Sequence, residues 1–199
     1  MNAQVHDNDQ SLREAGISFV TNALDLRRQP DRLLQCNQTP SVELWRDGIA
    51  SVRYYPPLLS SEIRFDGDTV DVRPTQFDIP ILLVPPLGVH AWVYDLLNER
   101  SWVRYFLSQG FKVYLLDWGT VRKQDSDLTL EDYVLRWLPQ ATEAVRKHSG
   151  QQDISMMGYC MGGLLSLMYL AATEDKQVRN LVTVASPVDF HRLGLQGLI

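Results

Sequence analysis

The fold of this chain is decided by the stretch Met156-Met157-Gly158-Tyr159-Cys160-Met161-Gly162-Gly163, in which glycines stand two residues before and two residues after a cysteine. An apolar run precedes it, and an apolar, helix-compatible stretch over 164–172 follows. This order of strand, sharp turn and helix is the context of a nucleophile elbow, whose reactive residue sits in a strained conformation at the tip of a central strand. Glycine is needed at Gly158 and Gly162 because a Cβ there would collide with the neighbouring strand or helix. We therefore interpret Cys160 as a nucleophile.

The same motif predicts an oxyanion site. The backbone N–H of Met161, at the N-terminus of the predicted helix, would face the oxyanion of a tetrahedral intermediate. Gly163 would let that helix pack closer still. A packing explanation stands beside this one, because glycine and cysteine also fill tight crossings of strands and helices.

Composition excludes several classes of function. The chain has 199 residues, 45% hydrophobic and 22% charged, as expected for one soluble globular domain. Its net charge of −5 gives no electrostatic support for a nucleic-acid partner. The polar N-terminus lacks a signal-peptide pattern, and no apolar run approaches the ~18 residues of a membrane span. Cys36 and Cys160 make no disulfide framework and the histidines show no metal-ligand spacing, so we expect a cytoplasmic protein without a metal.

The chain is expected to have two parts. Apolar positions recur at helical spacing from Ser11 to Arg28, which predicts an amphipathic helix within an N-terminal helical extension over 1–38. Residues 39–199 would form an α/β core.

The core is predicted from its apolar runs. The turns Asp47-Gly48 and Asp66-Gly67 flank strand-like segments over 49–55 and 69–72, which we expect to pair as an antiparallel start to the sheet. Continuous rather than alternating apolar strands then predict a parallel sheet with helices on both faces. These strands cover 79–84, 112–118, 153–157 and 178–184, with helices expected over 94–108 and 129–147. Thr129 and Asp132 would cap the second helix, whose core face is expected to comprise Val134, Leu135, Leu138, Ala141, Ala144 and Val145.

This pattern is that of an α/β-hydrolase, in which an acid and then a histidine follow the nucleophile along the chain. The only histidine after Cys160 is His191, too close to Asp189 to bridge it to the thiol in the usual way. Glu174 and Asp175 would lie at the opposite end of the sheet. His90 fits an oxyanion-loop or packing role better than that of a base. Because two further strands normally follow, we expect the sheet to be incomplete at its C-terminal edge, in an N-terminal portion of a longer enzyme or a shortened relative.

Several separated motifs together resemble one family. The sequence Gly158-Tyr159-Cys160-Met161-Gly162-Gly163 is similar to the cysteine-containing lipase-like box of polyhydroxyalkanoate synthases, and the resemblance is greatest to the catalytic subunit of the two-subunit type. It implies that Cys160 carries the growing acyl chain and that the family's Asp and His lie beyond Ile199. The loop over 85–90 departs from the family pattern, so Leu87 is only a candidate second oxyanion donor. The other matching segments cover 113–119, 128–134, 166–169, 178–183 and 187–190.

The resemblance implies an acyltransferase that polymerises 3-hydroxyacyl-CoA with release of CoA. No cofactor is expected, since the CoA thioester is itself a substrate. The growing polyester and a second synthase subunit or a second copy are the expected partners, with the polyester granule surface as a location. A cysteine supports transfer, because its thioester keeps the acyl group's transfer potential, whereas serine would form an ordinary ester. The alternatives are a cysteine-dependent esterase or thioesterase, and a non-catalytic member that binds a partner or a granule.

Overall fold

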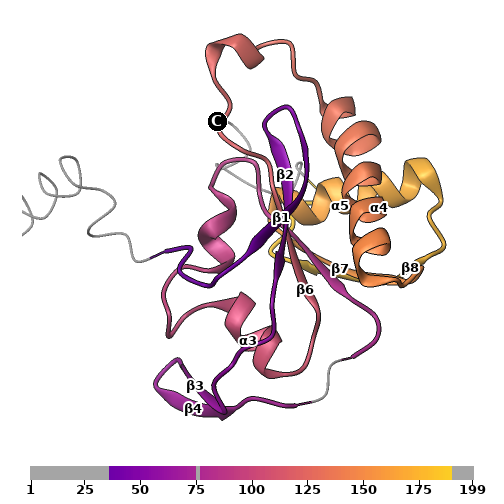
Figure 1. Ribbon diagram of the computed structural model, residues 1–199. Coiled ribbons are helices and arrows are strands. Elements are labelled where there is room, and N and C mark those ends of the chain that lie inside the picture. Colours follow the sequence, from indigo (N-terminus) through magenta and orange to yellow (C-terminus); the bar gives the residue numbers. More distant parts are fainter. Residues whose placement is uncertain (1–35, 75–76, 190–199) are drawn as a thin grey trace, which may run out of the picture. The chain divides into compact units, whose positions relative to one another are not determined.

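The computed structural model describes residues 36–74 and 77–189 (Figure 1). The helix expected over 11–28 lies outside these residues, as does nearly all of the N-terminal extension, so both stay predictions. Where the chain is described, none of its helices has the length and apolar character needed to cross a membrane.

A six-stranded mixed sheet forms the centre of the described part (Figure 1). The first three strands in spatial order, β1, β2 and β6, pair antiparallel, and the pairs β6–β5, β5–β7 and β7–β8 are parallel. This confirms the predicted, mostly parallel α/β sheet. In spatial order the strands are β1 (Val42–Asp47), β2 (Ala50–Tyr55), β6 (Val113–Asp117), β5 (Ile81–Val84), β7 (Ile154–Tyr159) and β8 (Val178–Val184).

The expected pairing of 49–55 with 69–72 is wrong. Strand β2 pairs with β1 across the turn at Gly48 and with β6 on its other side. Strand β4 (Asp68–Asp71) instead pairs with β3 (Glu62–Phe65) in a separate two-stranded sheet. Strand β2 thus pairs with β1, and β4 with β3, each across a two-residue turn. These short loops close at a smaller entropic cost than the longer connection between β2 and β4 would.

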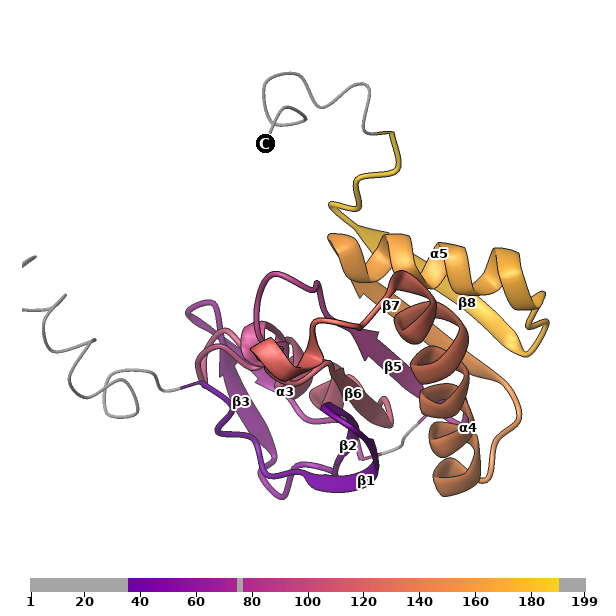
Figure 2. The same cartoon turned by 90° about the horizontal axis from the view of Figure 1, so that it is seen from above.

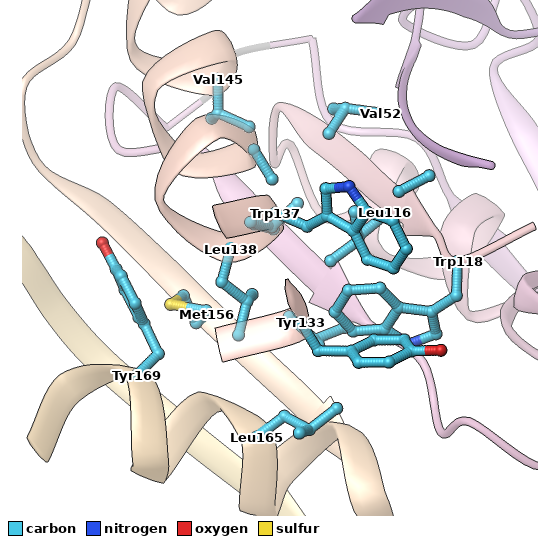
Figure 3. Close-up of a cluster of buried hydrophobic side chains, with 14 of the residues drawn as sticks. Val52, Leu116, Trp118, Tyr133, Trp137, Leu138, Val145, Met156, Leu165 and Tyr169 are labelled. Atoms are coloured by element: carbon cyan, nitrogen blue, oxygen red, sulfur yellow. The ribbon is translucent and has the colours of Figure 1, made fainter. Parts of the chain in front are cut away.

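Apolar side chains cover both faces of the sheet. In β5, Leu82 and Val84 point into one buried cluster, whereas Ile81 and Leu83 point into the other. The first cluster packs under α4 (Leu138–Ser149) and α5 (Met161–Thr173), as the side chains in Figure 3 show. The second lies under η1 (Ala91–Tyr94) and α3 (Trp102–Ser108) on the opposite face (Figure 2). Burial on both faces explains why these strands read as continuous apolar runs.

The helix expected over 94–108 is interrupted. Only η1 and α3 form, separated by irregular chain at 95–101. Asp95 is 2% exposed, and its carboxylate accepts hydrogen bonds from the amide and hydroxyl groups of Thr39 and from the Ser101 hydroxyl. Ser101 in turn caps α3 by accepting the Arg104 N–H at 3.1 Å. Side-chain hydrogen bonds of this kind compete with continued helix.

The helical segment expected over 129–147 forms, with one irregularity. The Thr129–Asp132 cap is confirmed, since the Thr129 amide donates to the Asp132 carboxylate at 2.8 Å. A π-helical segment (Asp132–Trp137), labelled η3, precedes α4, and a Lys123–Asp125 3-10 turn (η2) lies upstream. Leu135, expected in the core, is 52% exposed, and Trp137 is 1% exposed. The buried face of this segment therefore includes Val134, Trp137 and Leu138, and Leu135 lies on the exposed side.

Candidate active site

The predicted elbow forms between β7 and α5. Cys160 has φ 52° and ψ −122°, a combination that non-glycine residues rarely adopt. Its N–H donates to the Val184 carbonyl at 2.8 Å, and its carbonyl accepts the Gly163 N–H at 3.1 Å. Backbone hydrogen bonds on both sides thus hold the strained conformation, while the residue stays partly exposed.

Three glycines are required by the close approach of backbone around Cys160. A Cβ at Gly158 would lie 2.3 Å from the Gly163 Cα, in the first turn of α5. At Gly162 it would lie 2.2 Å from the Val84 carbonyl oxygen, at the end of β5. At Gly163 it would lie 2.0 Å from the Ser186 hydroxyl. Any other residue type at Gly158 or Gly162 would therefore displace backbone of the elbow, whereas at Gly163 the Ser186 side chain would have to move.

Two backbone N–H groups are available as oxyanion donors. Met161 is the first residue of α5, so its N–H has no acceptor within the helix. Leu87 carries the first N–H after β5, because Pro85 and Pro86 have none. Within the described residues, the Leu87 N–H makes no hydrogen bond to the protein. The Pro85 carbonyl oxygen would lie 2.6 Å from a Cβ at Gly162, so the backbone at Pro85 is in close contact with Gly162. Gly162 directly follows Met161, and Pro85 lies two residues before Leu87, so this contact brings the segments that carry the two N–H groups together.

A buried tyrosine joins the two strands that carry these groups. The Tyr94 hydroxyl lies 3.2 Å from both the Val84 and the Met157 carbonyl oxygens, one on β5 and one on β7. Burial raises the pKa of Tyr94, so the hydroxyl stays a donor. An apolar cavity of about 210 Å³ lies beside it at the carboxyl ends of β7 and β8. It is lined by Val93, Tyr94, Trp102, Met157, Tyr159 and Val184.

Among the described residues, Asp175, His90 and His148 make their contacts away from the thiol. Asp175 forms an ion pair with Arg146 at 2.7 Å, just beyond the end of α5 that is remote from Cys160. His148 accepts or donates a 2.9 Å hydrogen bond with Tyr114, and His90 stacks on Trp92 with 5.6 Å between ring centroids. His191 lies outside the described residues. Over 36–74 and 77–189, no histidine bonds to Cys160 and no group of three His, Cys, Asp or Glu could hold a metal.

Sequence reasoning missed two residues that shape this site. The Trp118 indole N–H donates to the Pro85 carbonyl at 2.8 Å, and the Ser186 side chain packs against Gly163. Neither residue lies in the elbow motif. The one signal in the sequence was that each lies at or just after the end of a predicted strand, at the end of the sheet where the elbow lies. The roles of Cys160, Met161 and Leu87 remain predictions, although the backbone geometry agrees with them.

Comparison with known proteins places the chain in a class. The family model for the alpha/beta hydrolase fold matches residues 79–196, more than half of the chain. The chain therefore belongs to the alpha/beta hydrolase family. Among solved structures, a sugar hydrolase from Lactococcus lactis gives a TM-score of 0.49 at 15% identity, covering 74% of this chain and 53% of that chain.

The predicted resemblance to polyhydroxyalkanoate synthases is confirmed. The chain is 46% identical over 120 residues to the poly(3-hydroxyalkanoate) polymerase subunit PhaC of Haloferax mediterranei, covering 60% of this chain and 24% of that protein. It is 37% identical over 123 residues to the corresponding subunit of Allochromatium vinosum, covering 62% and 34%. The chain thus spans about a quarter of the length of the first of these curated relatives and about a third of the second.

Proposed function

We propose that this chain is the nucleophile-bearing part of an acyltransferase that polymerises 3-hydroxyacyl-CoA into polyhydroxyalkanoate. The observation that carries the proposal is the backbone of Cys160, held at φ 52° between β7 and α5. A strained cysteine whose partly exposed side chain stands beside unpaired helix N–H groups suits nucleophilic attack better than packing. Similarity to polymerase subunits supplies the class of substrate.

The reaction follows from these groups. The Cys160 thiolate attacks the thioester carbonyl carbon, a new S–C bond forms, and the carbonyl oxygen takes up the electron pair. Met161 and Leu87 N–H groups stabilise that oxyanion. Its collapse breaks the bond to CoA, which leaves as a thiolate, and Cys160 keeps the acyl group as a thioester. The 3-hydroxyl oxygen of a second unit then attacks the carbonyl carbon of this thioester, a C–O bond forms and the C–S bond to Cys160 breaks. The polyester is longer by one ester bond, Cys160 leaves as a thiolate, and the hydroxyl proton goes to that thiolate or to solvent.

This reaction needs no cofactor, because the CoA thioester already activates the acyl group. We place the enzyme in the cytoplasm at the surface of the polyester granule, where the growing chain accumulates. Its partners are the polyester and either a second synthase subunit or a second copy of the enzyme.

Mass spectrometry after incubation with 3-hydroxybutyryl-CoA tests the proposal. We expect an acyl adduct on Cys160 that is absent from Cys160→Ala and retained in the matched control Cys36→Ala. Turnover by the 199-residue chain should fall well below the usual enzymatic range of about 1–10³ per second, since no described base contacts the thiol. An unmodified Cys160 would contradict the proposal and favour a non-catalytic binding member.

The product separates transfer from hydrolysis. Release of free 3-hydroxybutyrate without any oligomer would identify a cysteine-dependent thioesterase instead. Oligomers of 3-hydroxybutyrate attached to Cys160 are expected for the polymerase.

A further inference from the structure

The loop that carries Leu87 is anchored at its first peptide group. The Pro85 carbonyl accepts a 2.8 Å hydrogen bond from the indole N–H of Trp118, which is 5% exposed. Trp118 immediately follows β6, the neighbour of β5 in the sheet. The bond therefore ties the exits of two adjacent parallel strands together at the end of the sheet where the elbow lies.

The Trp118–Pro85 hydrogen bond constrains Leu87, because only Pro86 lies between Pro85 and Leu87. Proline fixes φ near −65°, so Pro85 and Pro86 leave few ways to turn between the anchored carbonyl and the Leu87 N–H. The same Pro85 carbonyl packs on Gly162, next to Met161. Trp118 thus sets the position of the Leu87 N–H relative to the elbow.

We propose that Trp118 is a positioning residue for acyl transfer, whose indole N–H holds the Pro85 carbonyl so that the Leu87 N–H points at the oxyanion. This inference rests on the proposed function, because it needs acyl transfer at Cys160. A misplacement of about 1 Å in a catalytic group can cost about a hundredfold in rate. Loss of the anchor should therefore slow acylation without blocking access to the thiol.

Packing alone does not explain the tryptophan at this position. Trp118 and Trp137 belong to the same aromatic cluster with Tyr133, with 6.4 Å between the two tryptophan ring centroids (Figure 3). Trp137 is also buried, but its indole N–H has no hydrogen-bond partner in the described structure. The two residues therefore differ in the hydrogen bond and share the aromatic packing, which makes Trp137→Phe a matched control for Trp118→Phe.

Two reagents separate oxyanion stabilisation from thiol reactivity. With p-nitrophenyl acetate, the Cys160 thiolate attacks the carbonyl carbon, an oxyanion forms, and p-nitrophenolate leaves as the acetyl thioester is made; the thiol proton goes to solvent. With iodoacetamide, the sulfur displaces iodide at a saturated carbon and no oxyanion forms. The ratio of acetylation rate to alkylation rate at Cys160 therefore measures the oxyanion site, and mass spectrometry follows both.

We expect Trp118→Phe to lower this ratio about ten- to hundredfold and Trp137→Phe to leave it unchanged. An unchanged ratio in Trp118→Phe, or an equal loss in both variants, would overturn the inference. If Trp118→Phe does not fold, replacement of Trp118 by benzothienylalanine keeps the ring shape, removes the N–H, and gives the same readout.

The outcome also separates the inference from the proposed function. If the wild-type chain reacts with iodoacetamide at Cys160 but is not acetylated, no oxyanion site exists and the inference is wrong. If it is acetylated by the ester with the expected loss in Trp118→Phe but never acylated by 3-hydroxybutyryl-CoA, the inference stands and the proposed substrate fails.

Discussion

Cys160 has a backbone conformation that costs a non-glycine residue on the order of 1–3 kcal/mol. It persists because its N–H is bonded to Val184 and because Gly158 and Gly162 let the flanking backbone approach. The surrounding structure therefore maintains a cysteine in a position that packing alone would not favour.

Cys160 should react faster than Cys36 with limiting iodoacetamide at neutral pH. It directly precedes α5, and the N-terminus of a helix stabilises a thiolate. Peptide mapping after partial reaction measures the ratio, with urea-unfolded protein as the control in which the difference should disappear. Faster labelling of Cys36 in folded protein would contradict the assignment of the nucleophile.

Gly162→Ala should destabilise the fold by about 1–3 kcal/mol or more, because the added Cβ would lie 2.2 Å from a strand carbonyl oxygen. Urea unfolding followed by circular dichroism measures the loss. Gly88→Ala is the matched control, since nothing lies within 4 Å of its added Cβ. Equal stability of the two variants would show that β5 and α5 can separate at no cost.

Two serines whose hydroxyl groups are buried should respond to alanine in opposite directions. The Ser186 hydroxyl is buried without a hydrogen-bond partner in the described structure, so Ser186→Ala should be neutral or stabilise by up to about 1 kcal/mol. The Ser166 hydroxyl donates to the Gly162 carbonyl at 2.7 Å, and Ser166→Ala should destabilise by about 1 kcal/mol. Thermal unfolding of both variants measures the difference. A lower melting temperature for Ser186→Ala than for Ser166→Ala would contradict this prediction.

Among the elements, α5 is held at both ends. Its first turn packs on β5 through Gly162, and its last turns are joined to α4 through a buried set of polar groups. Arg146 of α4 donates to Asp175 at 2.7 Å and to the Gln152 carbonyl, and the Tyr169 hydroxyl of α5 donates to the same carboxylate. The helix that presents the elbow thus cannot tilt without breaking a buried ion pair.

This ion pair predicts a pH dependence. Burial raises the pKa of Asp175, but hydrogen bonds from Tyr169 and Arg146 outweigh it, and the net effect lowers the pKa. A lowered pKa in the folded state adds stability above the unfolded-state pKa of about 3.9, and this stability is lost as pH falls through the folded-state value. We expect Asp175→Asn to cost about 3–5 kcal/mol at neutral pH, because it leaves Arg146 buried without its charge partner.

Urea unfolding between neutral pH and about pH 3 measures this effect. The difference between wild type and Asp175→Asn should shrink as the pH falls. Asp153→Asn is the control, since Asp153 pairs with a largely exposed arginine, Arg179. A difference that stays constant with pH would assign the loss to packing rather than to charge.

At the scale of the molecule, β8 is the least covered strand of the parallel group. In the described part of the chain it pairs with β7 only, and Val182 is 50% exposed, whereas the residues of β7 are mostly buried. Within the described residues, β8 is thus an edge strand of the sheet. An open apolar edge offers backbone donors and acceptors to another strand.

We therefore expect the 199-residue chain to self-associate through β8. Light scattering coupled to size-exclusion chromatography, across a dilution series at micromolar concentrations, should show mass rising with concentration. Val182→Lys should shift the protein toward the monomer, whereas Val121→Lys, in a loop and 56% exposed, should not. A monomer at every concentration would contradict this prediction.

The class of fold was predictable because its signals are local. Continuous apolar runs showed buried parallel strands, and the elbow lies within eight consecutive residues, so Cys160, Gly158 and Gly162 were identified without knowledge of distant contacts. The turns at Gly48 and Gly67 were likewise predicted from dipeptides. In such cases the backbone conformation depends on neighbours in the chain, which the sequence lists directly.

What the tertiary structure decided depends on residues far apart in the chain. The break at Asp95 arises from bonds to Thr39, 56 residues away, and the Leu87 loop is anchored by Trp118, 33 residues beyond Pro85. The pairing of β2 with β6 was decided in the same way, since these two strands are far apart in the chain and no local turn joins them. The sequence by itself determined the parallel sheet, the elbow and its cysteine, because these follow from short-range pattern. The position of the Leu87 loop was decided only by folding, since a hydrogen bond between distant residues leaves no periodic trace in the sequence.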